Sequence, residues 1–296
     1  MKILRPAFLM LIGVAVSGVA SAQHKSGDPT APQFTQSAPN VFRRFAVDLA
    51  KMKEFYGDVL GLQPLPAINM PGGGQMTRFH VGTSEIKLQP APAESSVTHP
   101  AIADGIGLRV FTFFFPDEAA LSARFRAHGL PAPEFASTAG STARTAMVRD
   151  PSGQWVELVV KPGAPAATLD ALEVGLTVTN LEKSRAFYRD FVGLDELPPV
   201  ADARLGVTRY PYRLGTTTIN VYSFGKGGAA IKSSAGIQYV INNVDAVDAR
   251  AKERSVQIDR PLGPFGTGLR TIWLGDPDGI TNYFAQVATR TTAIER

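Results

Sequence analysis

The pattern of apolar and polar positions changes its period within one stretch of the chain, EVGLTVTNLEKSRAFYRDFVGL at residues 173–194. From Val174 to Val178 every second residue is apolar, which is typical of a half-buried β-strand. From Asn180 onward the apolar residues recur at helical spacing, and the Asn180 side chain is placed to cap the helix. Gly193 ends this pattern, because glycine readily adopts the left-handed conformation that closes a helix. The stretch therefore predicts a strand followed by a capped helix.

The same unit occurs once before, in FAVDLAKMKEFYGDVLGL at residues 45–62, with Asp48 as the cap and Gly61 as the stop. The Phe-Tyr pairs of the two units begin at Phe55 and Phe187, which are 132 residues apart. The two stretches thus predict the same strand and helix at two places in the chain.

A second signature repeats farther along, as DPSGQWVEL from Asp150 and DPDGITNYF from Asp276, 126 residues apart. Two markers in the same order at nearly one offset indicate an internal duplication. Each half divides in two again, so that the order strand, helix, hairpin, strand is expected four times. Short strands with one helix per unit predict an α+β fold, with helices packed outside curved sheets.

Residues 1–22 are typical of a cleaved signal peptide. They have a basic start, an apolar run too short to span a bilayer, and the small residues Ala20-Ser21-Ala22 at a cleavage site. We expect a mature chain that begins at Gln23 and is periplasmic or secreted. The other predicted boundaries are a flexible leader at 23–40, a first domain at 41–161, a linker at 162–170, a second domain at 171–287 and a polar tail at 288–296.

Composition narrows the classes of partner. The chain has no cysteine, so no disulfide is expected, and domains of about 120 residues bury an adequate core without one. The formal net charge is +4, and loss of Lys2 and Arg5 with the signal peptide lowers it to about +2. There is no Lys/Arg-rich run and no second long apolar stretch. We therefore expect neither a nucleic-acid partner nor a membrane partner after cleavage; the oligomeric state is not predicted.

The four motifs DLAKMKEFYGDVLGL, DPSGQWVEL, TNLEKSRAFYRDFVGL and DPDGITNYF together resemble the vicinal oxygen chelate superfamily of glyoxalases, bleomycin-resistance proteins and extradiol dioxygenases. The resemblance covers nearly the whole mature chain. It implies paired βαβββ modules, two per half, with each pair curling into an open barrel around a ligand cleft. It also implies a divalent metal in that cleft, with ligands from the first strand, the second strand after the crossover and the last strand, and in glyoxalases one more from the first hairpin.

The positions that the resemblance assigns to metal ligands hold few ligand residues. In the first half they are Val41 (or Asn40 after a one-residue slip), Lys87, about Val110, and Glu157. In the second half they are Glu173, Asn220, Tyr239 (or Gln238 after a slip) and Tyr283. Only Glu157 and Glu173 are strong ligand types, and none of the four histidines falls at an expected position. We predict no complete metal site and no cofactor.

A cleft of other chemistry remains. The residues expected to line it are Lys87, Arg109 and Glu157 in the first half and Glu173, Asn220, Tyr239 and Tyr283 in the second. Such a mixture suits an anionic or zwitterionic small molecule. Equally, Glu157 could pair with a neighbouring arginine for structural reasons, and Glu173 could lie exposed at a strand edge.

Three functions are compatible with these observations. The first is an exported small-molecule binding protein, or a metal-independent relative of the family's enzymes. The second is a metal-dependent lyase or dioxygenase whose ligands are misplaced by a register error. The third is a non-catalytic structural or interaction protein whose clefts are filled by its own side chains. Ligand-type residues on the cleft strands would favour the second function, and bulky apolar residues would favour the third.

Overall fold

The computed structural model describes residues 30–70, 74–92, 101–137, 141–227, 229–230, 235–266 and 268–287. The predicted signal peptide, the start of the leader and the polar tail lie outside these ranges. Within them, no helix is both long enough and apolar enough to cross a membrane.

The chain contains four modules of strands and short helices. The first consists of β1 (Asn40–Phe45), α1 (Leu49–Lys53), η1 (Glu54–Val59), β2 (Gln63–Asn69), β3 (Gln75–Val81) and β4 (Ser84–Pro90). The second consists of η3 (Ile102–Asp104), β5 (Gly105–Phe115), α2 (Glu118–Ala127), β6 (Ala136–Ser137), β7 (Arg144–Arg149) and β8 (Trp155–Val160). The short helix α3 (Ala166–Leu169) then leads to the second half of the chain.

The third module consists of β9 (Leu172–Thr177), α4 (Leu181–Ala186), η4 (Phe187–Val192), β10 (Asp195–Glu196), β11 (Val200–Asp202), β12 (Val207–Leu214) and β13 (Thr217–Tyr222). After the short β14 (Ala229–Ala230), the fourth consists of β15 (Ala235–Val240), α5 (Val244–Glu253), β16 (Gln257–Pro264), β17 (Leu269–Gly275) and β18 (Thr281–Val287). The expected α+β fold of paired βαβββ modules is confirmed, and the sheets are open rather than closed barrels.

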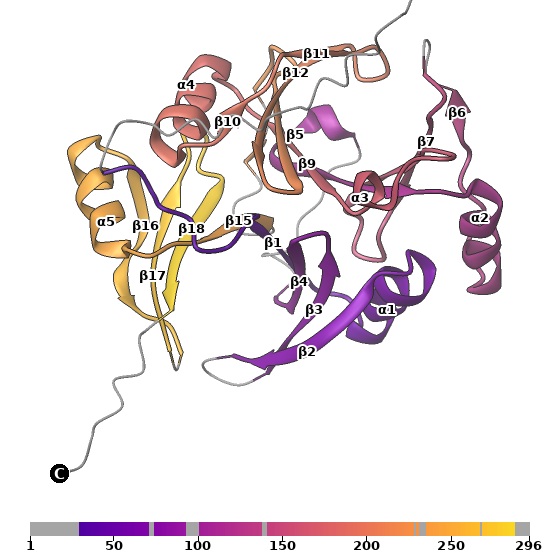
Figure 1. Cartoon of the computed structure of the whole chain (residues 1–296), viewed down its shortest axis with the longest axis horizontal. Helices are drawn as coiled ribbons and strands as arrows, with labels where there is room; N and C mark the ends of the chain where they lie inside the picture. Colours follow the sequence, from indigo (N-terminus) through magenta and orange to yellow (C-terminus); the bar gives the residue numbers. More distant parts are fainter. Residues whose placement is uncertain are drawn as a thin grey trace, which may run out of the picture.

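The modules pair across the two halves of the chain. One sheet has eight strands in the order β16-β17-β18-β15-β1-β4-β3-β2, so it joins the first module to the fourth. The other has ten strands in the order β10-β12-β13-β9-β5-β8-β7-β6, so it joins the second to the third. Figure 1 shows the indigo strands of the chain's start beside the yellow strands of its end. We call these the first and the second sheet. The expectation that the two modules of one half share a barrel is therefore wrong.

The seams of both sheets are antiparallel pairs of module-opening strands. β1 pairs with β15, with Asn40 opposite Gln238, and β5 pairs with β9, with Thr112 opposite Glu173. Period-two patterning determines which face of a strand is buried, but it does not name the neighbouring strand. For this reason the sequence indicated the strands and not their partners.

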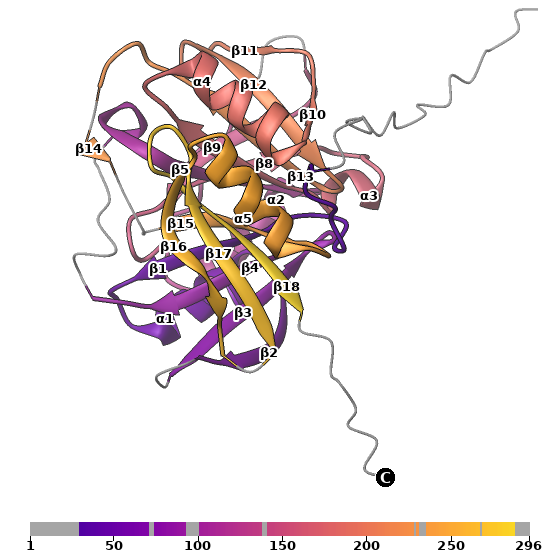
Figure 2. The ribbon, with the colours of Figure 1, turned by 90° about the vertical axis from the view of Figure 1, so that its left-hand side faces the viewer.

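The repeated helices form where the sequence predicted them. Asp48 caps α1 by accepting the backbone N–H of Ala50, and Asn180 caps α4 by accepting that of Lys183. Each helix continues into a π-helical turn at its Phe-Tyr pair, η1 or η4. Gly193 then closes η4 with a φ of 85°. Figure 2 shows how the remaining helix of the second half, α5, lies against the strands of the first sheet.

A buried tyrosine and a buried aspartate join the two modules within each half. The Tyr56 hydroxyl donates to Asp150 Oδ2 at 3.1 Å, and the Tyr188 hydroxyl donates to Asp276 Oδ2 at 3.2 Å. Both aspartates belong to the repeated DP-x-G turns, where Oδ1 also accepts backbone N–H groups. The two sequence markers of the duplication therefore contact each other, which explains why both repeat together.

The leader is packed where the structure describes it, so the expectation of flexibility is wrong for its second part. Thr35 donates its backbone N–H to Val240, and the Phe34 ring lies 5.9 Å from that of Tyr239. The Arg250 guanidinium donates to Thr30 Oγ1 at 2.6 Å. These contacts attach the start of the described chain to the fourth module.

Candidate functional site

The central strand of the second sheet brings both predicted carboxylates together. Thr112 on β5 lies opposite Glu157 of β8 on one side and opposite Glu173 of β9 on the other. Residues opposite each other in neighbouring strands share a face, so all three side chains lie on the face turned away from the helices. We call this the polar face of the sheet. Glu157 and Glu173, expected in separate clefts, thus belong to one site.

Hydrogen bonds hold these side chains in place. Thr112 Oγ1 donates to Glu157 Oε2 at 2.9 Å, and Asn220 Nδ2 on β13 donates to Glu173 Oε2 at 2.8 Å. The Glu157 side chain is 5% exposed and that of Glu173 is 28% exposed. We call Thr112, Glu157, Glu173 and Asn220 the second-sheet quartet.

Two arginines and one aspartate that sequence reasoning missed complete this site. Arg209 of β12 places Nη1 3.9 Å from Glu157 Oε2 and 3.9 Å from Glu173 Oε2. Arg204 places Nη2 2.7 Å from Glu157 Oε1. Asp202 pairs with both arginines. We call these two arginines and three carboxylates the arginine–carboxylate cluster. Asp202, Arg204 and Arg209 were missed because their segment supplies none of the positions implied by the resemblance.

Electrostatics and local hydrogen bonds favour the ionised form of Asp202. Burial acts to raise its pKa, but the Arg209 charge and the backbone N–H of Leu205 outweigh this effect and hold the pKa below its ordinary value. Asp202 Oδ1 accepts the backbone N–H groups of Arg204 and Leu205, which fixes the turn after β11. The loop that carries Arg204 is therefore tied to the sheet.

Apolar side chains cover the rest of this polar face. Ile102 of η3 packs with Val110 and Tyr222, and partly buried residues of β12 and its preceding loop, Leu205 and Val207, join the same cluster. Arg109, predicted to line the cleft, instead donates from Nε to the Ile102 carbonyl at 3.2 Å and from Nη2 to Ala101 at 2.9 Å. Arg109 thus holds the covering segment in place.

The first sheet carries an equivalent quartet on its own polar face. Asn40 corresponds to Glu173 and Lys87 to Asn220, each 133 residues earlier in the chain. The members of each corresponding pair occupy the same place in the strand pairing of their sheet. Gln238 and Tyr283 lie 126 residues after Thr112 and Glu157, again with the same registers. We call Asn40, Lys87, Gln238 and Tyr283 the first-sheet quartet. Asn40 and Gln238 are the residues that a one-residue slip of the predicted register would select.

Lys87 is the centre of this second arrangement. Its ammonium donates to Gln238 Oε1 at 2.6 Å, and the same oxygen accepts Asn40 Nδ2 at 3.2 Å. The nearest carboxylate, Glu85, lies 3.6 Å away and is shared with Arg78, whose Nη1 is 3.0 Å from it. Burial lowers the pKa of Lys87 below its ordinary value, an effect that the Glu85 charge partly opposes. Two cations thus share one carboxylate here.

Aromatic rings extend the polar face beside Lys87. The ring centroids of Trp273 and Tyr283 lie 5.3 Å apart in a stacked arrangement, and Phe42 lies 5.5 Å from Tyr283. Arg260 lies over Trp273, with its guanidinium carbon 5.7 Å from the ring centroid. We call Lys87, Gln238, Phe42, Trp273 and Tyr283, together with Asn40, the lysine–aromatic face.

Tyr239 lies on the opposite side of the first sheet from this face. Its ring stacks on Phe284 at 5.0 Å inside the main core, and its hydroxyl reaches Asn282 Oδ1 at 3.4 Å. The side chain is fully buried. Tyr239 is therefore a core residue and not a cleft residue, since the strand register places its neighbour Gln238 on the polar face.

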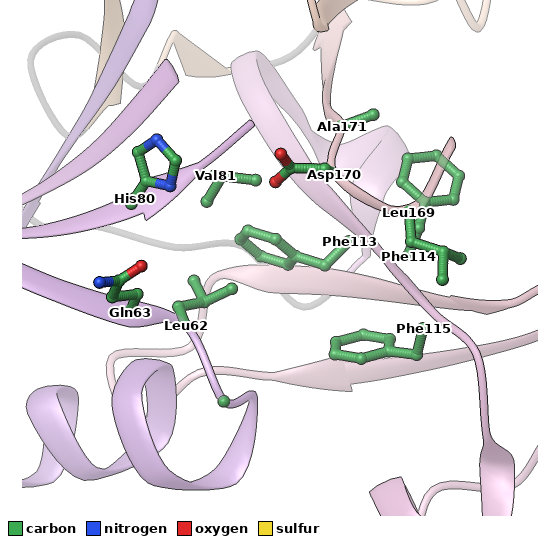
Figure 3. Close-up of a pocket in the computed structure, with 11 residues that line it drawn as sticks. Leu62, Gln63, His80, Val81, Phe113, Phe114, Phe115, Leu169, Asp170 and Ala171 are labelled. Atoms are coloured by element: carbon green, nitrogen blue, oxygen red, sulfur yellow. The ribbon is translucent and has the colours of Figure 1, made fainter. Parts of the chain in front are cut away.

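A separate pocket of ≈ 220 Å³ opens between the first module, the end of β5 and the segment that leads into β9. Figure 3 shows Phe113 and Leu62 beneath Val81, with His80 and Asp170 on the rim. The polar lining residues Gln63, His80 and Asp170 are exposed, and Asp170 already accepts the backbone N–H of Gly82 at 2.7 Å. No residue of either quartet lines this pocket, so it is distinct from both polar faces.

Comparisons with known proteins agree with this architecture. The family model described as "Glyoxalase/Bleomycin resistance protein/Dioxygenase superfamily" matches residues 39–158 and 170–284. The chain belongs to this superfamily. A search of curated proteins gives no match.

Solved structures share the fold at low sequence identity. A variant of glyoxalase I from Zea mays superposes with a TM-score of 0.66 at 21% identity, covering 84% of this chain and 92% of its own. A proposed dioxygenase from Bacillus subtilis gives a TM-score of 0.62 at 17% identity, covering 87% and 86%. Likeness at this level establishes the fold and not the activity.

The divalent metal that the resemblance implies does not fit the residues present. In the part of the chain that the structure describes, no group of three or more His, Cys, Asp or Glu side chains is placed to hold a metal ion. In the second-sheet quartet both carboxylates already face arginine, and in the first the corresponding positions are Asn40 and Tyr283. Neither quartet offers the set of oxygen or nitrogen ligands that a divalent ion requires.

Proposed function

We propose that this protein binds a small organic anion with a flat apolar part on the lysine–aromatic face, without a bound metal. The observation that carries this proposal is the Lys87 ammonium. It is buried against a neutral amide oxygen of Gln238 and has only a share of one carboxylate. A buried ammonium is stabilised by an anionic partner, because burial without a counter-charge is costly.

The charge around the face supports an anionic ligand. Lys87 and Arg78 share Glu85, and Arg44 follows Phe42 on the same side of β1 two residues later. Among the described residues, Arg44 has no ion pair, and its buried Nε has no hydrogen-bond partner. A carboxylate or phosphate placed between Lys87 and Arg44 would satisfy both.

The aromatic part of the face supports a flat apolar group on the same ligand. Phe42, Trp273 and Tyr283 form a continuous cluster beside Lys87, and such rings favour stacked or edge-on contact with another ring. The indole Nε1 of Trp273 is buried without a hydrogen-bond partner among the described residues. A polar substituent on the ligand would give this N–H group an acceptor.

The test compares benzoate and 2-naphthoate with their neutral amides by calorimetry and thermal shift. We expect the acids to bind and the amides to bind at least about tenfold more weakly, since only the acids carry the charge that Lys87 would pair with. Lys87→Met should weaken binding of the acids by about tenfold or more, whereas Lys87→Arg should retain most of it. Lys53→Met, on the exposed surface of α1, is the matched control and should bind as the wild type does.

Two results would count against the proposal. One is equal binding of acid and amide, which would remove the role of charge. The other is unchanged affinity of Lys87→Met in a protein that melts as the wild type does, which would place the ligand elsewhere.

A further inference from the structure

The Arg209 guanidinium lies among three carboxylates that come from different parts of the second sheet. Its Nε donates to Asp202 Oδ2 at 2.7 Å, and its Nη2 contacts the same oxygen. Its Nη1 lies at one distance, 3.9 Å, from an oxygen of Glu157 on β8 and an oxygen of Glu173 on β9. One side chain thus joins a loop, the last strand of one module and the first strand of another.

The Arg209 guanidinium lies beside both carboxylates of the second-sheet quartet. Glu157 and Glu173 flank Thr112 on neighbouring strands, and Asn220 is bonded to Glu173. The three side-chain carboxylates and the two guanidinium groups of Arg204 and Arg209 leave the cluster with one excess negative charge. Without Arg209 the excess would be two, which a divalent cation would balance.

We propose that Arg209 replaces a metal ion in this family member, by supplying from within the chain the positive charge that holds the second-sheet quartet and the 202–206 loop together. With the guanidinium between them, the carboxylates do not form a metal-holding group. Once it is removed they are free to close on a divalent ion, whose preferred ligands are carboxylate oxygens. The inference concerns the second sheet and is independent of the ligand proposed for the first.

The experiment measures whether a divalent ion can take over from the side chain. Wild type, Arg209→Lys and Arg209→Met are melted as whole chains in EDTA and in a titration of MnCl₂, and Mn²⁺ binding is followed by calorimetry. We expect MnCl₂ to raise the melting temperatures of wild type and Arg209→Lys by less than about 1 °C, because an ion that does not bind the native state does not stabilise it. Arg209→Met should melt lower in EDTA, recover with Mn²⁺, and bind Mn²⁺ about tenfold more tightly than wild type or better.

A double variant identifies the ligands. Arg209→Met combined with Glu173→Gln removes one carboxylate and should lose the recovery in Mn²⁺. If Arg209→Met does not fold in EDTA, Arg209→Gln is melted in its place, and Arg209→Met is refolded from denaturant with and without MnCl₂. Refolding only with the ion supports the inference.

Three results would overturn it: saturable stabilisation of the wild type by Mn²⁺, a folded Arg209→Met that gains no Mn²⁺ affinity, or failure of Arg209→Met to refold even with the ion.

Discussion

The polar faces of the two sheets are built on one frame and carry opposite chemistry. Both place four residues at the same registers of the opening and closing strands. In the second sheet Arg204 and Arg209 neutralise Glu157 and Glu173, and Ile102 packs over the neighbouring rings. In the first sheet the ammonium of Lys87 stands in excess over the acidic groups beside it. The carboxylates of the second face are paired with arginines and keep one negative charge in excess, whereas the cations Lys87 and Arg78 of the first face outnumber their one shared carboxylate, Glu85.

This difference shows how a duplicated fold can separate two tasks. The second sheet uses its quartet to hold a loop and three strands together, which contributes to stability. The first sheet places a cation with only a shared carboxylate beside aromatic rings, which is the arrangement that we propose binds a ligand. The predictions below test whether the frame is shared and whether the two faces differ as described.

The largest expected effect concerns the shared frame. Phe55→Ala and Phe187→Ala should each destabilise the protein by about 3–5 kcal/mol, because both rings are buried at equivalent points of the repeat. Denaturant melts would measure both variants. Losses under about 1 kcal/mol for the two would contradict the assignment of these helices to the core.

Equivalent positions in the two quartets should respond differently. Glu157→Gln should lower the free energy of unfolding by about 1–3 kcal/mol, because it leaves Arg204 and Arg209 without part of their counter-charge. Tyr283→Phe, at the matching position of the first sheet, keeps the ring stacked on Trp273 and should cost less than about 1 kcal/mol. Equal losses in chemical denaturation would remove the structural distinction between the faces.

A pH-dependent effect concerns the two aspartates of the DP-x-G turns. Burial raises the pKa of Asp276 to about 7, whereas at Asp150 the Arg43 guanidinium, 3.8 Å away, opposes the rise in pKa. Between pH 4 and 7 folded Asp276 binds more protons than the unfolded chain does, so its contribution to stability falls as pH rises, by up to about 1.4 kcal/mol per pH unit.

Asp276→Asn should flatten that pH dependence, and Asp150→Asn should flatten it less. Urea melts of the three proteins at pH 4, 5.5 and 7 would measure the slopes. The idea fails if Asp276→Asn keeps the slope of the wild type.

The sequence predicted the frame well because each part of it has a local cause. The caps Asp48 and Asn180 and the stop Gly193 act within one or two turns of the residues they affect. The repeated Phe-Tyr and DP-x-G markers indicated the duplication, and the family follows from them. Glu157, Glu173 and Asn220 came from the family resemblance, and the structure places all three on the polar face of the second sheet.

What the sequence did not show depends on long-range register. The choice between Asn40 and Val41, or between Gln238 and Tyr239, is a shift of one residue, and one residue exchanges the polar face for the core. The meeting of Glu157 with Glu173 required knowing that β5 lies between β8 and β9. Arg209 lies on a strand that supplies no member of the quartet, so nothing in its spacing connected it to them.

The crossed pairing of the modules has a consequence for how the molecule assembles. Taken alone, the first half would leave β1 without β15 and β5 without β9, which are two exposed strand edges of the kind that seek a partner chain. A second copy of a half would offer matching edges, so the fold has the layout of a dimer whose subunits are joined in one polypeptide. Residues 162–170 make that joining covalent and replace a concentration-dependent encounter with a tethered one.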